Sequence, residues 1–201
     1  MLLPHTFVFD DVFDFDITQL SNYEWHPFPQ HSTPWYSNRV FHESTKVWDS
    51  NTPTICKDAY QISLDLFKQI NPECTVNRTV RCMIHKYTPD TLMNTMDIHR
   101  DEFAPDYWST IFYVDGTGPT DFFTSRDEES YVGSVDFKKG RVSIFPAGYW
   151  HRPSKQQNVD RIVIAFTFEV YNLVPEMNGV CQLCTCGKSP SIYCTGMHNP
   201  D

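Results

Sequence analysis

One stretch of the chain has the apolar spacing of an amphipathic helix. Its apolar residues recur three or four positions apart, at Ala59, Ile62, Leu66 and Ile70. Asp58 stands near its start, and Asn71-Pro72 follows as a stop signal. This spacing puts the apolar side chains on one face, so we predict a helix over residues 57–70.

Beyond residue 78 the pattern changes to that of β-strands. Val80, Cys82 and Ile84 alternate with polar neighbours, and several short β-rich runs follow, separated by turn residues. These runs lie at residues 109–114, 122–124, 131–137, 141–145 and 161–170. Many short strands at near-regular spacing are typical of an all-β sandwich or jelly roll. We therefore predict a mostly β fold with the helix supporting one face.

The remaining segments complete a single-domain organisation. Residues 6–9 predict a strand that runs into an acidic turn. Residues 25–53 hold four prolines without a sustained period, which predicts an ordered loop rather than a linker. Trp25, Trp35, Trp48, Tyr36 and Tyr23 could line a substrate cleft, but packing beneath this loop is the favoured interpretation. We expect one domain over residues 1–170, with its core at 78–170 and supporting segments at 1–77, followed by an appendage at 171–201.

Composition and charge limit the classes of protein. The 201 residues can form one sizeable core, and 16 basic against 25 acidic residues give a net charge of -9. This balance argues against nucleic acid as a partner, because binding its backbone needs a basic face. We find neither a signal peptide nor a membrane span. With seven cysteines, an odd number, we expect a reduced, cytoplasmic setting.

Three residues near the ends of predicted strands have the composition of a metal site. His99 and Asp101 stand two residues apart, and His151 follows the strand at 141–145. Two imidazoles and one carboxylate suit a non-haem Fe(II) ion, because they leave positions open for a co-substrate and O₂. Arg161 opens an apolar strand, where an unpaired cation is costly. We expect it to bind the carboxylate of an anionic co-substrate.

Four further blocks accompany these residues: Lys86-Tyr87-Thr88-Pro89, Ile111-Phe112-Tyr113-Val114-Asp115, Gly118-Pro119-Thr120-Asp121-Phe122, and residues 139–145. Together with His99, Asp101, His151 and Arg161, they resemble the 2-oxoglutarate/Fe(II)-dependent oxygenases, and most closely the prolyl 4-hydroxylase-like branch. The resemblance covers residues 78–170. It implies a double-stranded β-helix, which is a jelly-roll or cupin-like fold.

The resemblance also implies roles for individual residues. His99, Asp101 and His151 would be the catalytic iron ligands. Arg161 and Tyr113 would hold the distal carboxylate of 2-oxoglutarate, with Tyr87 in the same pocket. The implied reaction is hydroxylation by Fe(II), 2-oxoglutarate and O₂, with release of succinate and CO₂. Its substrate would be a peptidyl side chain, such as a prolyl one in a peptide or protein, or a small amino-acid-like molecule.

The chain departs from the family pattern at two positions, and other functions stay open. Val163 stands where many relatives place Ser or Thr, and Pro119 replaces a glycine. One alternative is a non-catalytic cupin-like binding or structural module, and another is a metal-dependent cupin dioxygenase that would not need Arg161. A nucleic-acid demethylase of the same superfamily is disfavoured, because residues 161–166 lack the Arg-rich signature of that branch.

The last stretch of the chain is rich in metal-ligating residues. They are Cys181, Cys184, Cys186, Cys194 and His198. Thiolates and imidazoles at such spacing could supply four ligands to Zn²⁺. Disulfides or free thiols are the alternatives, so a zinc site in this Cys-rich appendage is a hypothesis.

Overall fold

The computed structural model of the chain describes residues 3–27, 36–42, 47–89, 97–154 and 159–174. Most of the described elements are strands. In chain order the elements are β1 (Phe7–Phe9), η1 (Ile17–Leu20), β2 (Tyr36–His42), β3 (Val47–Trp48), α1 (Thr54–Ile70), β4 (Thr75–Tyr87), β5 (Tyr107–Asp115), β6 (Thr120–Phe123), η2 (Glu128–Ser130), β7 (Tyr131–Val135), β8 (Val142–Pro146), β9 (Trp150–Pro153) and β10 (Arg161–Tyr171).

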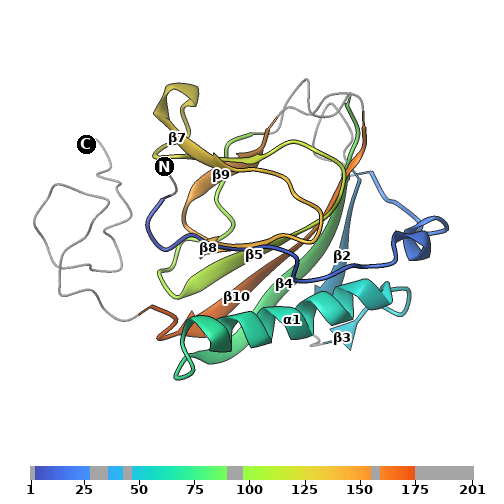
Figure 1. Cartoon of the computed structure of the whole chain (residues 1–201), viewed down its shortest axis with the longest axis horizontal. Helices are drawn as coiled ribbons and strands as arrows, with labels where there is room; N and C mark the ends of the chain where they lie inside the picture. The colour runs from blue at the N-terminus through green and yellow to red at the C-terminus, as the bar shows by residue number, and fades with distance from the viewer. Residues whose placement is uncertain (1–2, 28–35, 43–46, 90–96, 155–158, 175–201) are drawn as a thin grey trace, which may run out of the picture.

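The strands form two antiparallel sheets (Figure 1). The larger sheet has the order β1-β8-β5-β10-β4-β2-β3, and the smaller sheet has the order β7-β6-β9. In Figure 1 the helix α1 runs along one side of the larger sheet, and the strands of the smaller sheet lie on the other side. The predicted jelly roll supported by a helix is confirmed.

Both faces of the larger sheet are buried, which explains why β5 and β10 read as mostly apolar runs. On β5, all seven residues from Trp108 to Val114 are buried. One apolar cluster fills the layer between the sheet and α1. A second cluster joins the opposite face of this sheet to Phe122 and Val135 of the smaller sheet. The candidate site lies in this second layer, inside the barrel.

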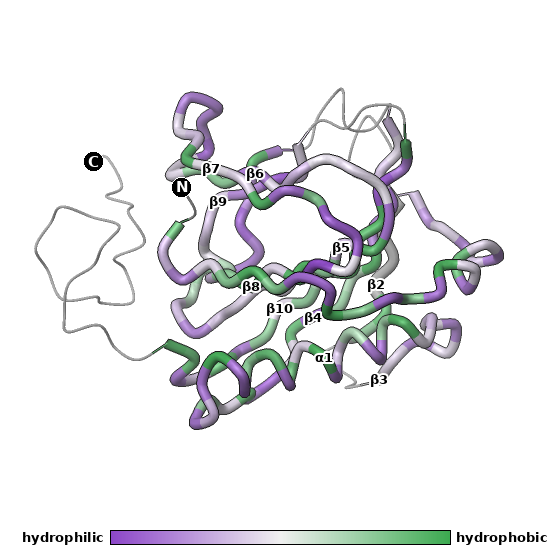
Figure 2. Tube along the Cα trace, in the orientation of Figure 1, coloured by the Kyte–Doolittle hydropathy of each residue, from purple (hydrophilic) through white to green (hydrophobic). Residues whose placement is uncertain are grey.

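The helix α1 confirms the prediction from apolar spacing. It ends at Ile70 as predicted and begins at Thr54, three residues earlier, directly after Pro53. Figure 2 shows apolar and polar segments alternating along α1. Its buried Phe67 packs edge-on against Phe168 of β10, with ring centroids 5.2 Å apart. Full burial of one such side chain stabilises the fold by about 1.5–3 kcal/mol.

The interpretation of residues 25–53 as a loop is wrong in part, because β2 and β3 lie within it. The backbone of β2 pairs with β4, and β3 pairs with β2 at the edge of the larger sheet. The residues of β4 that pair with β2 lie 39 to 50 positions further along the chain, and the apolar pattern of the segment does not indicate this pairing. Aromatic packing is confirmed for Tyr23, Trp25 and Trp48, which pack against the cluster beneath α1. Trp35 and the side chain of Tyr36 lie outside the described residues.

The Cys-rich segment 175–201 lies outside the described residues, so zinc binding there stays a prediction. Three other cysteines, Cys56, Cys74 and Cys82, are buried with free thiols. None of the described helices is both long and apolar enough to cross a membrane.

Candidate metal centre

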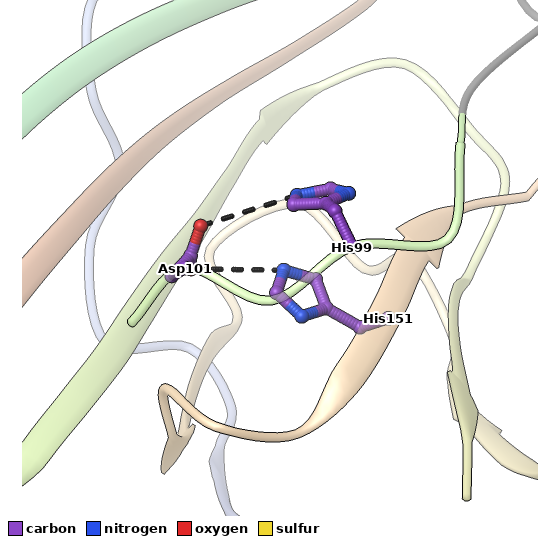
Figure 3. Close-up of side chains that lie close together, drawn as sticks. All are labelled: His99, Asp101 and His151. Carbon is purple, nitrogen blue, oxygen red and sulfur yellow. Dashed lines mark ion pairs between the residues drawn. The ribbon is translucent and has the colours of Figure 1, made fainter. Parts of the chain in front are cut away.

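The structure brings together the three residues that the sequence proposes as metal ligands. One ligand atom from each of His99, Asp101 and His151 lies within 4.8 Å of the others. Figure 3 shows both imidazole rings directed toward the carboxylate. The Asp101 oxygens lie 3.9 Å from Nε2 of His99 and 3.6 Å from Nε2 of His151. One ion could contact all three side chains.

Backbone hydrogen bonds hold the two ligand-bearing segments side by side. His99 and His151 form an isolated antiparallel bridge, with N–H···O distances of 3.0 and 2.9 Å. The N–H of Asp101 donates to the carbonyl of Ala147 at 3.0 Å. The segment before β5 is therefore clamped to the turn between β8 and β9. His99 lies on this bridge rather than at the end of a longer strand.

Both histidines present Nε2 to the carboxylate. Nδ1 of His99 lies 3.0 Å from the carbonyl of Asp97, and Nδ1 of His151 lies 2.9 Å from that of Tyr149. Because a carbonyl oxygen can only accept, Nδ1 carries the proton and Nε2 keeps its lone pair. Burial lowers the pKa of His151 to about 4, although the nearby Asp101 opposes this shift. The buried imidazole is thus neutral at pH 7, as a metal ligand must be.

Two side chains that the sequence does not single out hold Asp101 in place. Arg81 of β4 donates to one carboxylate oxygen, and the hydroxyl of Ser109 donates to the other at 2.5 Å. Nε of Arg81 also donates to Thr167 of β10 at 3.1 Å. Burial would raise the pKa of Asp101, but Arg81, the two imidazoles and Ser109 together hold it well below its usual range. Asp101 is therefore ionised and fixed in orientation.

Arg161 is a buried cation without a described carboxylate partner. Its side chain is enclosed in the barrel, and the residue is 1% exposed. It donates to the carbonyl of Pro119 at 2.8 Å and to the hydroxyl of Thr120 at 2.9 Å. Nε is buried and has no hydrogen-bond partner among the described residues. Pro119, which departs from the family pattern, thus supplies a carbonyl oxygen to the guanidinium.

The two tyrosines predicted for the same pocket surround Arg161. Its guanidinium lies 6.0 Å from the ring centre of Tyr87 and 5.6 Å from that of Tyr113. The hydroxyl of Tyr113 donates to Thr120 at 2.9 Å. Burial raises the pKa of Tyr87, so this phenol stays protonated. Their roles toward a co-substrate stay predictions, but the structure brings all three predicted residues close together.

A close approach by Gly116 brings the β5–β6 connection over Arg161. The φ angle of Gly116 is 113°, a value that side chains rarely allow. A Cβ atom added there would lie 2.4 Å from the carbonyl oxygen of Asp160 and 2.7 Å from Cα of Arg161. Only glycine fits this position, which leads the chain to Pro119 and Thr120.

The sequence comparisons leave the family unassigned, while the structural comparison identifies the fold. No protein-family model and no curated protein matches the chain. Solved structures do match. A prolyl-4-hydroxylase from Pseudomonas putida is 12% identical, with a TM-score of 0.54, covering 83% of this chain and 94% of that one.

Two further structures are similar to the same extent. A prolyl hydroxylase from Trichoplax adhaerens, in complex with a hypoxia inducible factor peptide fragment, is 12% identical, with a TM-score of 0.56, covering 82% of this chain and 83% of that one. HygX from Streptomyces hygroscopicus, with nickel, 2-oxoglutarate and hygromycin B bound, is 11% identical, with a TM-score of 0.53 and 82% of each chain covered. The chain therefore has the double-stranded β-helix fold of the 2-oxoglutarate/Fe(II) oxygenases, including the prolyl hydroxylases.

Proposed function

We propose that the protein is an Fe(II)- and 2-oxoglutarate-dependent oxygenase. It would hydroxylate a peptidyl side chain, such as a prolyl one, or a small amino-acid-like molecule, and release succinate and CO₂. The observation that carries this proposal is that one barrel holds both a His-Asp-His group and a buried arginine without a carboxylate partner among the described residues.

The donor set of the metal group fits Fe(II). His99, Asp101 and His151 offer two imidazole nitrogens and one ionised carboxylate, which leave positions free on an octahedral ion. When bound, Fe(II) supplies the oxygen chemistry, and the protein positions the reactants. The Nδ1 contacts to backbone carbonyls fix both rings, so the site needs little rearrangement to take up the ion.

Arg161 supports a dicarboxylate co-substrate. The described hydrogen-bond partners of the buried guanidinium are neutral oxygens, and Asp121, the described carboxylate that acts on it, lies beyond ion-pair distance. Burial lowers the pKa of Arg161, because the charged guanidinium loses its contacts with water. A carboxylate bound beside it would offset this loss. The unpartnered Nε is a further donor for an anion, and the hydroxyl of Tyr113 would become one if its proton turned away from Thr120. 2-Oxoglutarate could bind the metal through its 2-oxo acid end and Arg161 through its distal carboxylate.

The substrate would approach from the side of His99. The side chain of His99 is 40% exposed, whereas those of His151 and Asp101 are 5% and 12% exposed. Phe103, two residues beyond Asp101, is also exposed and offers an apolar surface on this loop. Among the similar structures, one prolyl hydroxylase holds a peptide and HygX holds hygromycin B. A peptide is our first choice, because two of these three structures are prolyl hydroxylases.

The test measures cofactor binding and turnover separately. Under anaerobic conditions, Fe(II) with 2-oxoglutarate should give a visible charge-transfer band. In air, succinate should form when the right member of a panel of peptides, amino acids and nucleic acids is present. His99→Ala should abolish both signals, and His26→Ala, an exposed histidine outside the site, should change neither.

Two results would overturn this proposal. Absence of the band in the wild-type protein would exclude the cofactor pair. A band without succinate from any member of the panel would instead favour a binding module that retained the barrel.

A further inference from the structure

A third histidine, His85, lies inside the barrel between the metal group and Arg161. Every second residue of β4 points to the face of the strand that carries the site. These residues are Arg81, Met83, His85 and Tyr87. The pairing of β4 with β10 places Tyr87 opposite Arg161 and His85 opposite Val163. The His85 ring stacks on Tyr87, with centroids 5.7 Å apart and planes 20° apart. His85 also interacts electrostatically with Asp101, His99 and Arg161, so it is near both parts of the site.

His85 has a buried polar atom that no described residue satisfies. Its Nδ1 is inaccessible to solvent and has no hydrogen-bond partner in the described part of the chain, and Nε of Arg161 is in the same state. Such atoms are rare in folded proteins because each one loses its contacts with water without replacement. Two of them, on paired strands that line one pocket, indicate a missing ligand that carries acceptor oxygens.

The protonation of His85 suits this role. Burial lowers its pKa to about 3, with Arg81 adding to the shift, so the ring is neutral at pH 7. A neutral imidazole with the proton on Nδ1 donates one hydrogen bond without adding a second buried cation. Arg161 then supplies the charge, and His85 supplies a directional contact.

We propose that His85 is a further contact for the co-substrate, donating from Nδ1 to the distal carboxylate that Arg161 holds. This inference rests on the proposed function. The side chain directly across the strand pair is Val163, which has no donor. Opposite residues on antiparallel strands have Cβ atoms only about 4.5–5.5 Å apart, so a donor on β4 can serve the same part of the pocket. The ligand class is therefore a 2-oxo acid with a second carboxylate.

The experiment compares 2-oxoglutarate binding to variants at this position. Calorimetric titration of 2-oxoglutarate into the Mn(II)-loaded protein measures affinity without turnover, and titration of Mn(II) alone measures the metal site. His85→Leu removes both ring nitrogens. His85→Asn keeps an amide donor near the position of Nδ1. His26→Leu, at an exposed histidine outside the site, is the matched control.

The proposal expects three results. His85→Leu should weaken 2-oxoglutarate binding at least about tenfold, because a hydrogen bond to a charged group is lost. His85→Asn should recover most of this affinity, and His26→Leu should bind like the wild type. Mn(II) affinity should be the same in all proteins. Should His85→Leu not fold, His85→Val, which suits a strand, replaces it.

Contrary results separate the two proposals. Unchanged 2-oxoglutarate affinity in His85→Leu would overturn the role of His85 alone. A parallel loss of Mn(II) affinity would show that His85 only supports the metal group, which also overturns it. A wild-type protein that binds Mn(II) but not 2-oxoglutarate would refute the proposed function, and the role of His85 with it.

Discussion

Replacing Thr120 with valine should remove the hydroxyl that accepts hydrogen bonds from both Arg161 and Tyr113. Thr120 is 1% exposed, and its hydroxyl accepts hydrogen bonds from Nη2 of Arg161 and from the hydroxyl of Tyr113, both at 2.9 Å. Valine has nearly the same shape as threonine, so Thr120→Val removes the oxygen without opening a cavity. Two buried donors would then lose their acceptor.

The magnitude follows from the kinds of bond lost. A hydrogen bond from a charged donor contributes about 1.5–3 kcal/mol, and one between neutral groups contributes about 0.5–1.5 kcal/mol. Tyr113 retains a second, longer contact with Ser143 at 3.4 Å, which reduces its share. We therefore expect Thr120→Val to lower the free energy of unfolding by about 2–4 kcal/mol. Total stabilities of about 5–15 kcal/mol make this change easy to measure.

Urea denaturation of the metal-free protein tests this expectation. Thr120→Ser keeps the hydroxyl and is the matched control, which should lose no more than about 1 kcal/mol for its missing methyl group. The dependence of the unfolding free energy on urea should be similar in all three proteins. The reasoning would be refuted if valine and serine destabilised the protein equally, or if valine had an effect below about 0.5 kcal/mol.

Two further predictions concern the metal group and pH. Arg81→Met leaves Asp101 without its cationic partner. It should lower the unfolding free energy of the metal-free protein by about 1–3 kcal/mol, which is less than for a fully buried pair because Arg81 is partly exposed. Excess Mn(II) should raise the unfolding temperature of this variant more than that of the wild type, because the ion replaces the missing charge; equal shifts would contradict this. His85 and His151 have folded pKa values of about 3 and about 4, below the value of about 6.5 in an unfolded chain. The unfolded state therefore binds more protons, so stability is complete above about pH 6.5 and falls as the pH drops toward 4. Between pH 7 and pH 5, urea denaturation should show that His85→Leu loses about 2 kcal/mol less of its unfolding free energy than the wild type. Identical losses would show that folding does not lower the pKa of His85.

Much of the fold and part of the site can be predicted from the sequence by itself. The helix at 54–70 follows from apolar spacing, because burial of one face selects that spacing. The strands of the barrel follow from short apolar runs bounded by turn residues. His99, Asp101, His151 and Arg161 stand out because few other functions use a His-x-Asp pair with a distant histidine and an arginine opening an apolar strand.

Only the tertiary structure decides which other side chains complete the site. Arg81 meets Asp101 across 20 positions of sequence, and Arg161 meets Thr120 across 41. His85 acquires its role from the register between β4 and β10. Single polar residues such as Arg81 and His85 form no spacing pattern that would mark them in the sequence. The alternation of polar and apolar residues along β4 is also what a strand with one face in solvent would show. The larger sheet instead turns those polar positions toward the barrel interior, where burial makes each unsatisfied donor costly and therefore functionally informative.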